Sequence, residues 1–149
     1  MFLYFYNSDY REIPSLIEKL KLKTSYKKGQ EKYSSAIILY NQARLNVIYG
    51  NEIEAIKLLE ESIRILSILN KDNDYYAEIS RELLIALYTD KKQFNKAKKI
   101  IKPKTLNGQI ALANIAFRQD EFLKAEKIIK RLYKIQVNQS EDENDDPTL

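Results

Sequence analysis

The chain has 149 residues, of which 44% are apolar and 31% charged, a balance typical of a soluble, helix-rich protein with one sizeable core. It contains no cysteine and no histidine, which excludes disulfides, thiolate nucleophiles, imidazole bases and the usual zinc ligands. Charge is unevenly placed, because all 25 basic residues precede position 139 and five acidic residues follow it. Residues 1–138 therefore carry +9 and the remainder −5.

The first residues, MFLYFYNSDY, are apolar for only six positions and have no basic segment before them. A secretory signal needs both a basic start and a longer apolar stretch. No stretch of the sequence approaches the roughly 20 apolar residues of a membrane span. We therefore expect a cytoplasmic protein with no membrane partner.

Apolar residues recur every three or four positions from the N-terminal region to about residue 137, which predicts helices. Ile53, Ile56, Leu59, Ile63 and Leu66 form one such face. Breaks are expected at residues 7–9, 23–30, 49–51, 70–74, 89–93, 102–108 and 118–120. Pro103 should end the helix predicted at 94–102 early, because proline removes a backbone donor. Residues 138–149 have almost no apolar side chain and are predicted to be a disordered acidic tail.

Four segments share one pattern of a polar turn, a small or apolar residue and an apolar residue four positions later. The small or apolar positions are Ile13, Ala55, Ala97 and Ala125, whose sequence numbers differ by 42, 42 and 28. Another predicted helix precedes each of the four segments, and the one before the first segment is only partial. Alanine suits a place where two helices cross closely, because a large side chain has no room there.

This pattern resembles the tetratricopeptide repeat, a helix–turn–helix unit ending in A-x₃-F with a period of about 34 residues. The last unit matches best, with Leu112, Ala113, Ala116, Phe122, Ala125, Ile129 and Leu132. The expected units are 1–22, 36–69, 78–102 and 106–137. The resemblance implies an all-α, right-handed solenoid of about three and a half units.

The residue types present do not indicate a catalytic site. The acidic pairs Glu60–Glu61, Asp72–Asp74 and Asp120–Glu121 fall on predicted helix surfaces or turns, where capping and solvation explain them. No glycine-rich phosphate loop and no metal-binding spacing occurs. We expect a non-enzyme without cofactor or metal.

The resemblance implies that the first helix of each unit lines an inner groove. The peptide-binding or protein-binding residues expected there are Tyr40, Arg44, Ile48, Glu82, Asn114, Phe117 and Arg118. Amide and guanidinium groups would satisfy a peptide backbone, and the apolar side chains would hold its side chains. The alternative is that these polar residues face water. The carboxylate clamp found in some members of this family is not expected, since Glu82 would repel an acidic tail.

The long spacing is similar to that of tetratricopeptide domains in Gram-positive receptors for peptide pheromones. Those carry an amino-terminal effector module that these residues do not contain. We expect regulatory binding of a peptide or protein, by this chain or by a longer repeat protein of which it is the carboxy-terminal portion.

Two alternatives remain. The chain could be an assembly module, with the aromatic stub at residues 1–6 docking on a partner or a second copy. Lysine clusters at 23–32 and 91–104 could also contact nucleic acid weakly, although no helix-turn-helix signature is present and such lysines usually form a solvated helix face. The acidic tail is either a solubilising end or a segment that folds back on the lysines.

Overall fold

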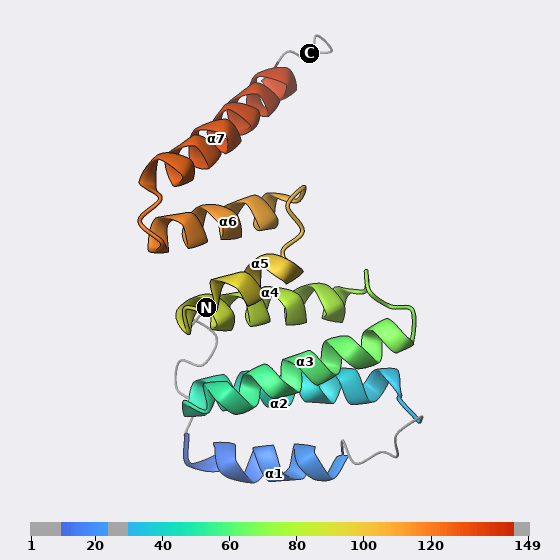
Figure 1. The fold of residues 1–149 in the computed structure, drawn as a ribbon. Coiled ribbons are helices and arrows are strands. Elements are labelled where there is room, and N and C mark those ends of the chain that lie inside the picture. The colour runs from blue at the N-terminus through green and yellow to red at the C-terminus, as the bar shows by residue number, and fades with distance from the viewer. Residues whose placement is uncertain (1–9, 24–29, 145–149) are drawn as a thin grey trace. The chain divides into compact units, whose positions relative to one another are not determined.

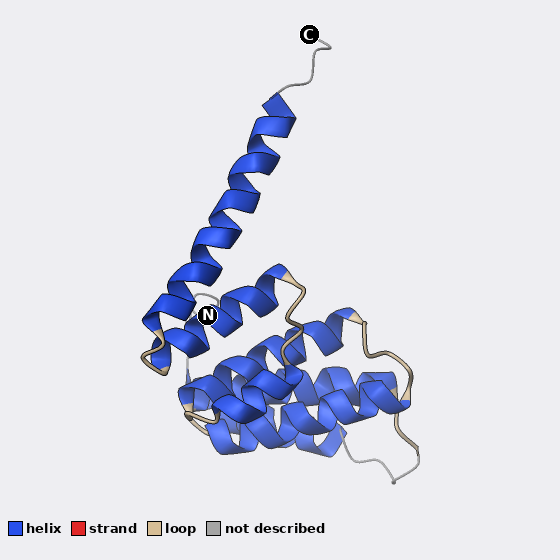
Figure 2. Ribbon diagram, turned by 45° about the horizontal axis from the view of Figure 1, so that its top comes forward, coloured by secondary structure: helices blue, strands red, loops and turns tan. Residues whose placement is uncertain are grey.

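The computed structural model describes residues 10–23 and 30–144, and every regular element in these ranges is helical (Figure 2). A short 3-10 turn, Tyr10–Glu12, leads into α1. The α-helices are α1 (Ile13–Lys23), α2 (Tyr33–Tyr49), α3 (Glu52–Ile68), α4 (Tyr75–Asp90), α5 (Phe94–Ile100), α6 (Leu106–Arg118) and α7 (Phe122–Asn144). The all-α prediction is confirmed. None of these described helices combines the length and apolarity that crossing a bilayer requires.

The chain divides into two compact units, residues 1–88 and 89–149. The first unit contains α1, α2, α3 and nearly all of α4. The second contains α5, α6 and α7. In the first unit α2 packs side by side with α3 and also against α1, and in the second unit α6 packs with α7 (Figure 1).

Three of the turns between helices have the same backbone geometry at the spacing of the sequence repeat. Gly50, Lys92 and Asp120 all take a left-handed conformation, with φ of 87°, 59° and 61°. The amide of each donates to the carbonyl three residues earlier, at 3.0–3.1 Å. Their sequence numbers differ by 42 and 28, and an alanine follows each of them five positions later. Asn70, after α3, also has a positive φ of 55° and donates to the carbonyl three residues earlier at 3.0 Å, so four of the described turns share this geometry and three of them lie at the repeat spacing.

The repeated alanines lie where the sequence placed them, inside the helix contacts. Ala55, Ala97 and Ala125 are at most 4% exposed. In the α2–α3 pair, Ala36 and Ala43 are also fully buried, and the Ser62 hydroxyl of α3 donates to the Ala36 carbonyl of α2 at 2.8 Å. A side chain that reaches the backbone of the neighbouring helix requires a close approach, which small residues allow.

The helix before Pro103 ends early, as predicted. Helix α5 stops at Ile100, and α6 begins after Thr105, whose side-chain oxygen accepts from the Gly108 amide at 3.0 Å. A Cβ at position 108 would lie 1.8 Å from the Lys102 carbonyl oxygen, so only glycine fits there. The connection is therefore tight rather than a long loop.

The two ends of the chain differ from the sequence prediction or lie outside the described residues. Helix α7 continues to Asn144, whereas the prediction placed the end of the helical body at 137 and disorder from 138. Residues 138–144 thus extend the helix, because nothing in this stretch breaks it: its first proline is Pro147. The aromatic stub at 1–6 and residues 145–149 lie outside the described residues.

Replacement of Gly50 tests the left-handed turn. No atom lies within 4 Å of a Cβ built there, so the cost of Gly50→Ala comes from backbone conformation alone. We expect a loss of about 1 kcal/mol in the free energy of unfolding, measured by urea denaturation with circular dichroism. Gly50→Asn should lose less, because asparagine tolerates this conformation. Equal losses for the two variants would contradict the interpretation.

Enlargement of Ala55 tests the close helix crossing. Because Ala55 has no exposed surface, Ala55→Leu forces the α2–α3 pair apart and should cost about 1–3 kcal/mol of unfolding free energy. Lys57→Leu, on the exposed face of the same helix, is the matched control and should change stability by less than about 0.5 kcal/mol. Similar values for both would show that position 55 has room to spare.

Candidate functional site

Three of the predicted groove residues come together in the first unit. The Arg44 guanidinium lies 5.8 Å from the centre of the Tyr40 ring, within the range of a cation–π contact. Burial raises the pKa of the Tyr40 phenol; the charge of Arg44 opposes this rise and that of Glu82 adds to it. Tyr40, Arg44 and Glu82 therefore share one electrostatic environment. Ile48 lies further along α2 and is partly buried.

An aromatic cluster that the sequence analysis did not single out fills the space around Tyr40. The Tyr76 ring of α4 meets Tyr40 edge-on at 5.9 Å and Tyr33 edge-on at 6.2 Å, both measured between ring centres. The outer ring of Tyr75 packs against Tyr76 at 5.5 Å. Tyr40 is consequently a packing residue between α2 and α4. A signal was present in the sequence, since Tyr33 and Tyr75 are separated by the 42-position interval of the repeat.

Asp74 ties this cluster to the start of α4. Its carboxylate accepts from the Tyr76 amide at 3.0 Å, as an N-cap does, and from the Tyr33 hydroxyl at 2.9 Å. The hydrogen bond to Asp74 raises the pKa of Tyr33 above its usual value. The Lys71 ammonium lies 5.0 Å from the centre of the Tyr33 ring. The start of α4 is thus held to α2 by polar as well as aromatic contacts.

The other end of α4 is held to α3. The Tyr88 hydroxyl donates to the Glu60 carboxylate, and only 6% of Tyr88 is exposed. Burial, and then the hydrogen bond to Glu60, raise the pKa of Tyr88 well above its usual value. Together with the Tyr76 contacts, this means that the start of α4 contacts α2 and the end of α4 contacts α3.

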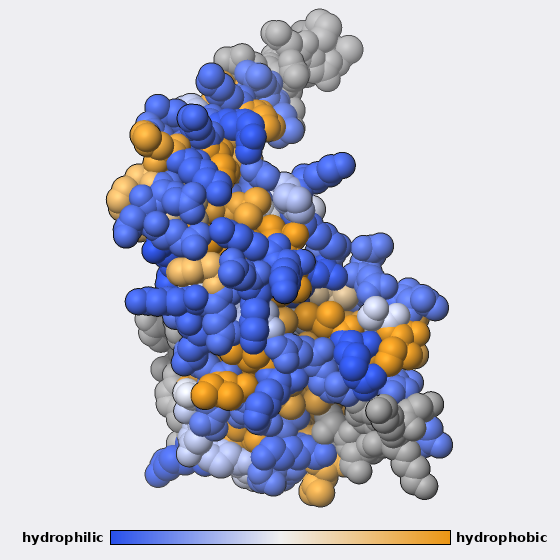
Figure 3. All heavy atoms as spheres, viewed as in Figure 1, coloured by the Kyte–Doolittle hydropathy of each residue, from blue (hydrophilic) through white to orange (hydrophobic). Residues whose placement is uncertain are grey.

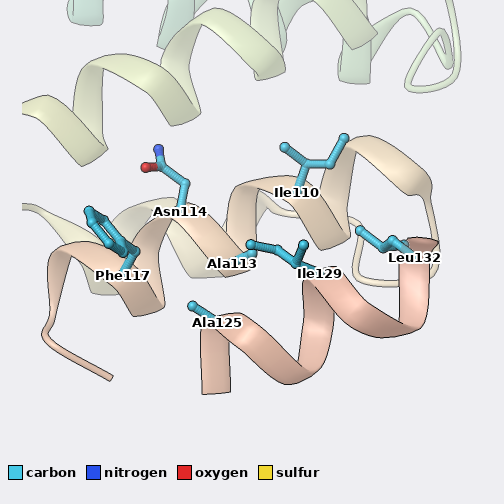
Figure 4. Close-up of a pocket in the computed structure, with 7 residues that line it drawn as sticks. All are labelled: Ile110, Ala113, Asn114, Phe117, Ala125, Ile129 and Leu132. Carbon is cyan, nitrogen blue, oxygen red and sulfur yellow. The ribbon is translucent and has the colours of Figure 1, made fainter. Parts of the chain in front are cut away.

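The second unit holds a hollow between α6 and α7. It is an open hollow with a volume of about 280 Å³, and its lining is apolar except for one amide (Figure 4). The lining residues are Ile110, Ala113, Asn114, Phe117, Ala125, Ile129 and Leu132. Two of the predicted groove residues, Asn114 and Phe117, are therefore brought together here. The third, Arg118, is not part of the lining and forms an ion pair with Asp90 at 3.1 Å.

Several large apolar side chains of this hollow are exposed. Ile110, Phe117 and Ile129 retain 52%, 60% and 58% of their accessible surface. Apolar patches are visible among the hydrophilic side chains of α6 and α7 in Figure 3. Clustered exposed apolar groups of this size mark a contact surface more often than scattered single residues do.

The sequence spacing of the lining residues explains why they lie along one face of each helix. On α6 the positions 110, 114 and 117 follow the i, i+4, i+7 pattern of one helical face, and on α7 so do 125, 129 and 132. Both stripes contribute to the lining of the hollow. Ala125, Ile129 and Leu132 fit the repeat pattern in the sequence, but the predicted groove comprised first helices alone and therefore did not include them.

The two units carry very different charge. Residues 1–88 contain twelve basic and twelve acidic side chains, so their net charge is zero. Residues 89–149 contain thirteen basic side chains and nine acidic ones, a net charge of +4, and five of the acids lie at positions 141–146. The hollow therefore lies in the unit that carries the positive charge of the protein. Within the described residues there is no group of three or more side chains suited to hold a metal ion.

Comparison with known proteins returned no relative: no family model, no curated protein and no solved structure matches this chain. The likeness to tetratricopeptide repeats thus depends on the residues quoted above and on the repeated turn geometry.

Replacement of Tyr88 tests how α4 is held. The folded pKa lies above the usual value of 10.0, so this contribution to stability is complete below pH 10 and is lost as the pH rises further. We expect Tyr88→Phe to reduce the fall in unfolding free energy above pH 10, measured by urea denaturation across that range.

The matched control is Tyr49→Phe, at a residue that is 51% exposed. It should leave the alkaline fall in stability as it is in the unmodified protein. An unchanged pH dependence in Tyr88→Phe would contradict the assigned contact with Glu60.

Proposed function

We propose that this chain is a non-catalytic module, built from tetratricopeptide-like helix hairpins, that binds a protein or peptide. The observation that carries the proposal is the hollow between α6 and α7, where three large apolar residues are each more than half exposed. Burying such surface on association is favourable by about 25 cal/mol per Å². A lining with a single polar side chain, Asn114, suits a partner that brings apolar groups and few hydrogen-bonding ones.

The predicted groove residues are not equally good candidates for binding a partner. Tyr40 contributes to the contact between α2 and α4, so less of its surface is left for a ligand. Asn114 and Phe117 border the hollow, which makes them the stronger candidates for binding. Regulatory peptide sensing, as in pheromone receptors, remains a specific form of this proposal and depends on the resemblance alone.

Selection from a displayed peptide library tests the function. We expect enriched peptides to bind the unmodified chain and to lose about tenfold or more in affinity for Ile129→Asp, because the substitution places a charge in an apolar contact. The measurement is the dissociation constant of each enriched peptide by fluorescence anisotropy.

Leu123→Asp is the matched control: it introduces the same charge on the same helix, at a residue that is 77% exposed and outside the hollow. It should leave the affinities unchanged. The proposal fails if no peptide is enriched or if the two variants bind equally well. A mass that rises with protein concentration and falls in Ile129→Asp would instead assign the hollow to self-assembly.

A further inference from the structure

The α6–α7 pair repeats the α2–α3 pair at a constant offset in the sequence. Ala125 lies 70 positions after Ala55, and Asp120 follows Gly50 at the same interval. The turn bonds repeat in register with them: the Asn51 amide donates to Asn46 at 2.7 Å, and the Glu121 amide donates to Ala116 at 2.8 Å. Each residue of the hollow therefore has a defined counterpart in the first unit.

The first-unit counterparts of the hollow residues are buried or partly buried, whereas the hollow residues themselves are exposed. Leu59, the counterpart of Ile129, has no exposed surface, whereas Ile129 is 58% exposed. Tyr40 corresponds to Ile110 and is partly buried, whereas Ile110 is 52% exposed. In the first unit α1 packs against α2, and α4 contacts both helices of the pair: its Tyr76 ring packs on Tyr40 and its Tyr88 hydroxyl donates to Glu60 of α3. The contacts of α4 with α2 and α3 indicate that an α-helix is complementary in shape to a helix pair of this kind.

Helix α4 is amphipathic and acidic. Ala77, Leu84 and Leu87 of α4 are each at most 3% exposed. Its charged residues are Glu78, Arg81, Glu82 and Asp90, three acids against one base. The second unit, with a net charge of +4 over residues 89–149, would attract a helix of this kind more strongly than the neutral first unit does.

We propose that the hollow between α6 and α7 docks an amphipathic α-helix of a partner protein, with its apolar face in the hollow and an acidic polar face. The helix lies across Ile110 and Phe117 of α6 and Ile129 of α7, as α4 contacts both α2 and α3. This inference depends on the proposed binding function and adds the conformation and charge of the partner. It follows the general mode in which one apolar face of an amphipathic helix is laid into an apolar groove.

The probe for the experiment comes from the chain itself. A synthetic peptide of residues 74–90, capped at both ends, contains the apolar face and the acidic charges of α4. A second peptide with Glu78→Lys and Glu82→Lys keeps the apolar face and reverses two charges. A third with Leu84→Pro keeps the charge and prevents a continuous helix. Binding of each labelled peptide to the full chain is measured by fluorescence anisotropy at two salt concentrations.

We expect the acidic peptide to bind, and the lysine peptide to bind about tenfold more weakly at low salt, with a smaller difference at high salt. The proline peptide should bind at least about tenfold more weakly. Ile129→Asp and, as a second hollow variant, Ile110→Asp should weaken the acidic peptide, and Leu123→Asp should not. Circular dichroism of each variant verifies that it remains folded.

The outcomes separate this inference from the function on which it depends. If library peptides bind at the hollow but the acidic helix does not, the inference is overturned and the binding function stands. Equal binding of the acidic and lysine peptides overturns the assigned charge, and equal binding of the proline peptide overturns the assigned conformation. If neither library peptides nor the helix bind, both proposals fall.

Discussion

The close crossing of two helices, made possible by alanine and set by a left-handed turn, is the constraint on which the rest of the structure depends. Gly50, Lys92 and Asp120 reverse the chain in the same way, and an alanine lies five positions after each. The turn determines where the second helix starts, and the alanine determines how near it approaches. Lys92 and Asp120 take a conformation that favours glycine, so packing of the helices must offset a local backbone cost.

A pair of helices built in this way buries one face and leaves another to be covered. In the first unit α1 packs against α2, α4 contacts both α2 and α3 through Tyr76 and Tyr88, and Leu59 has no exposed surface. Between α6 and α7, residues at the equivalent positions remain exposed. The same repeating unit thus produces a packed core in one place and an exposed apolar surface in another, and the difference is whether further helices pack on the pair.

Sequence patterns predicted part of the candidate site. Asn114 and Phe117 were named from the sequence and do border the hollow, because their spacing places them on one face of α6. Arg118, next in the chain, points to another partner and pairs with Asp90. Tyr40 and Arg44 were also predicted from the sequence, and Arg44 does lie over the Tyr40 ring. Tyr40, however, also packs against Tyr76, which is far along the chain, and helical periodicity does not predict contacts of this kind.

The sequence by itself determined the helical class, the places of most turns and the unequal intervals at which the helix pairs recur. These depend on local rules: apolar spacing, turn chemistry and alanine at a crossing. The tertiary structure alone decided which repeated faces are covered, where the two compact units divide and that α7 continues to Asn144. The physical reason is that burial is a property of the neighbouring helix as much as of the residue, so Leu59 and Ile129 hold equivalent positions in sequence and opposite environments in space.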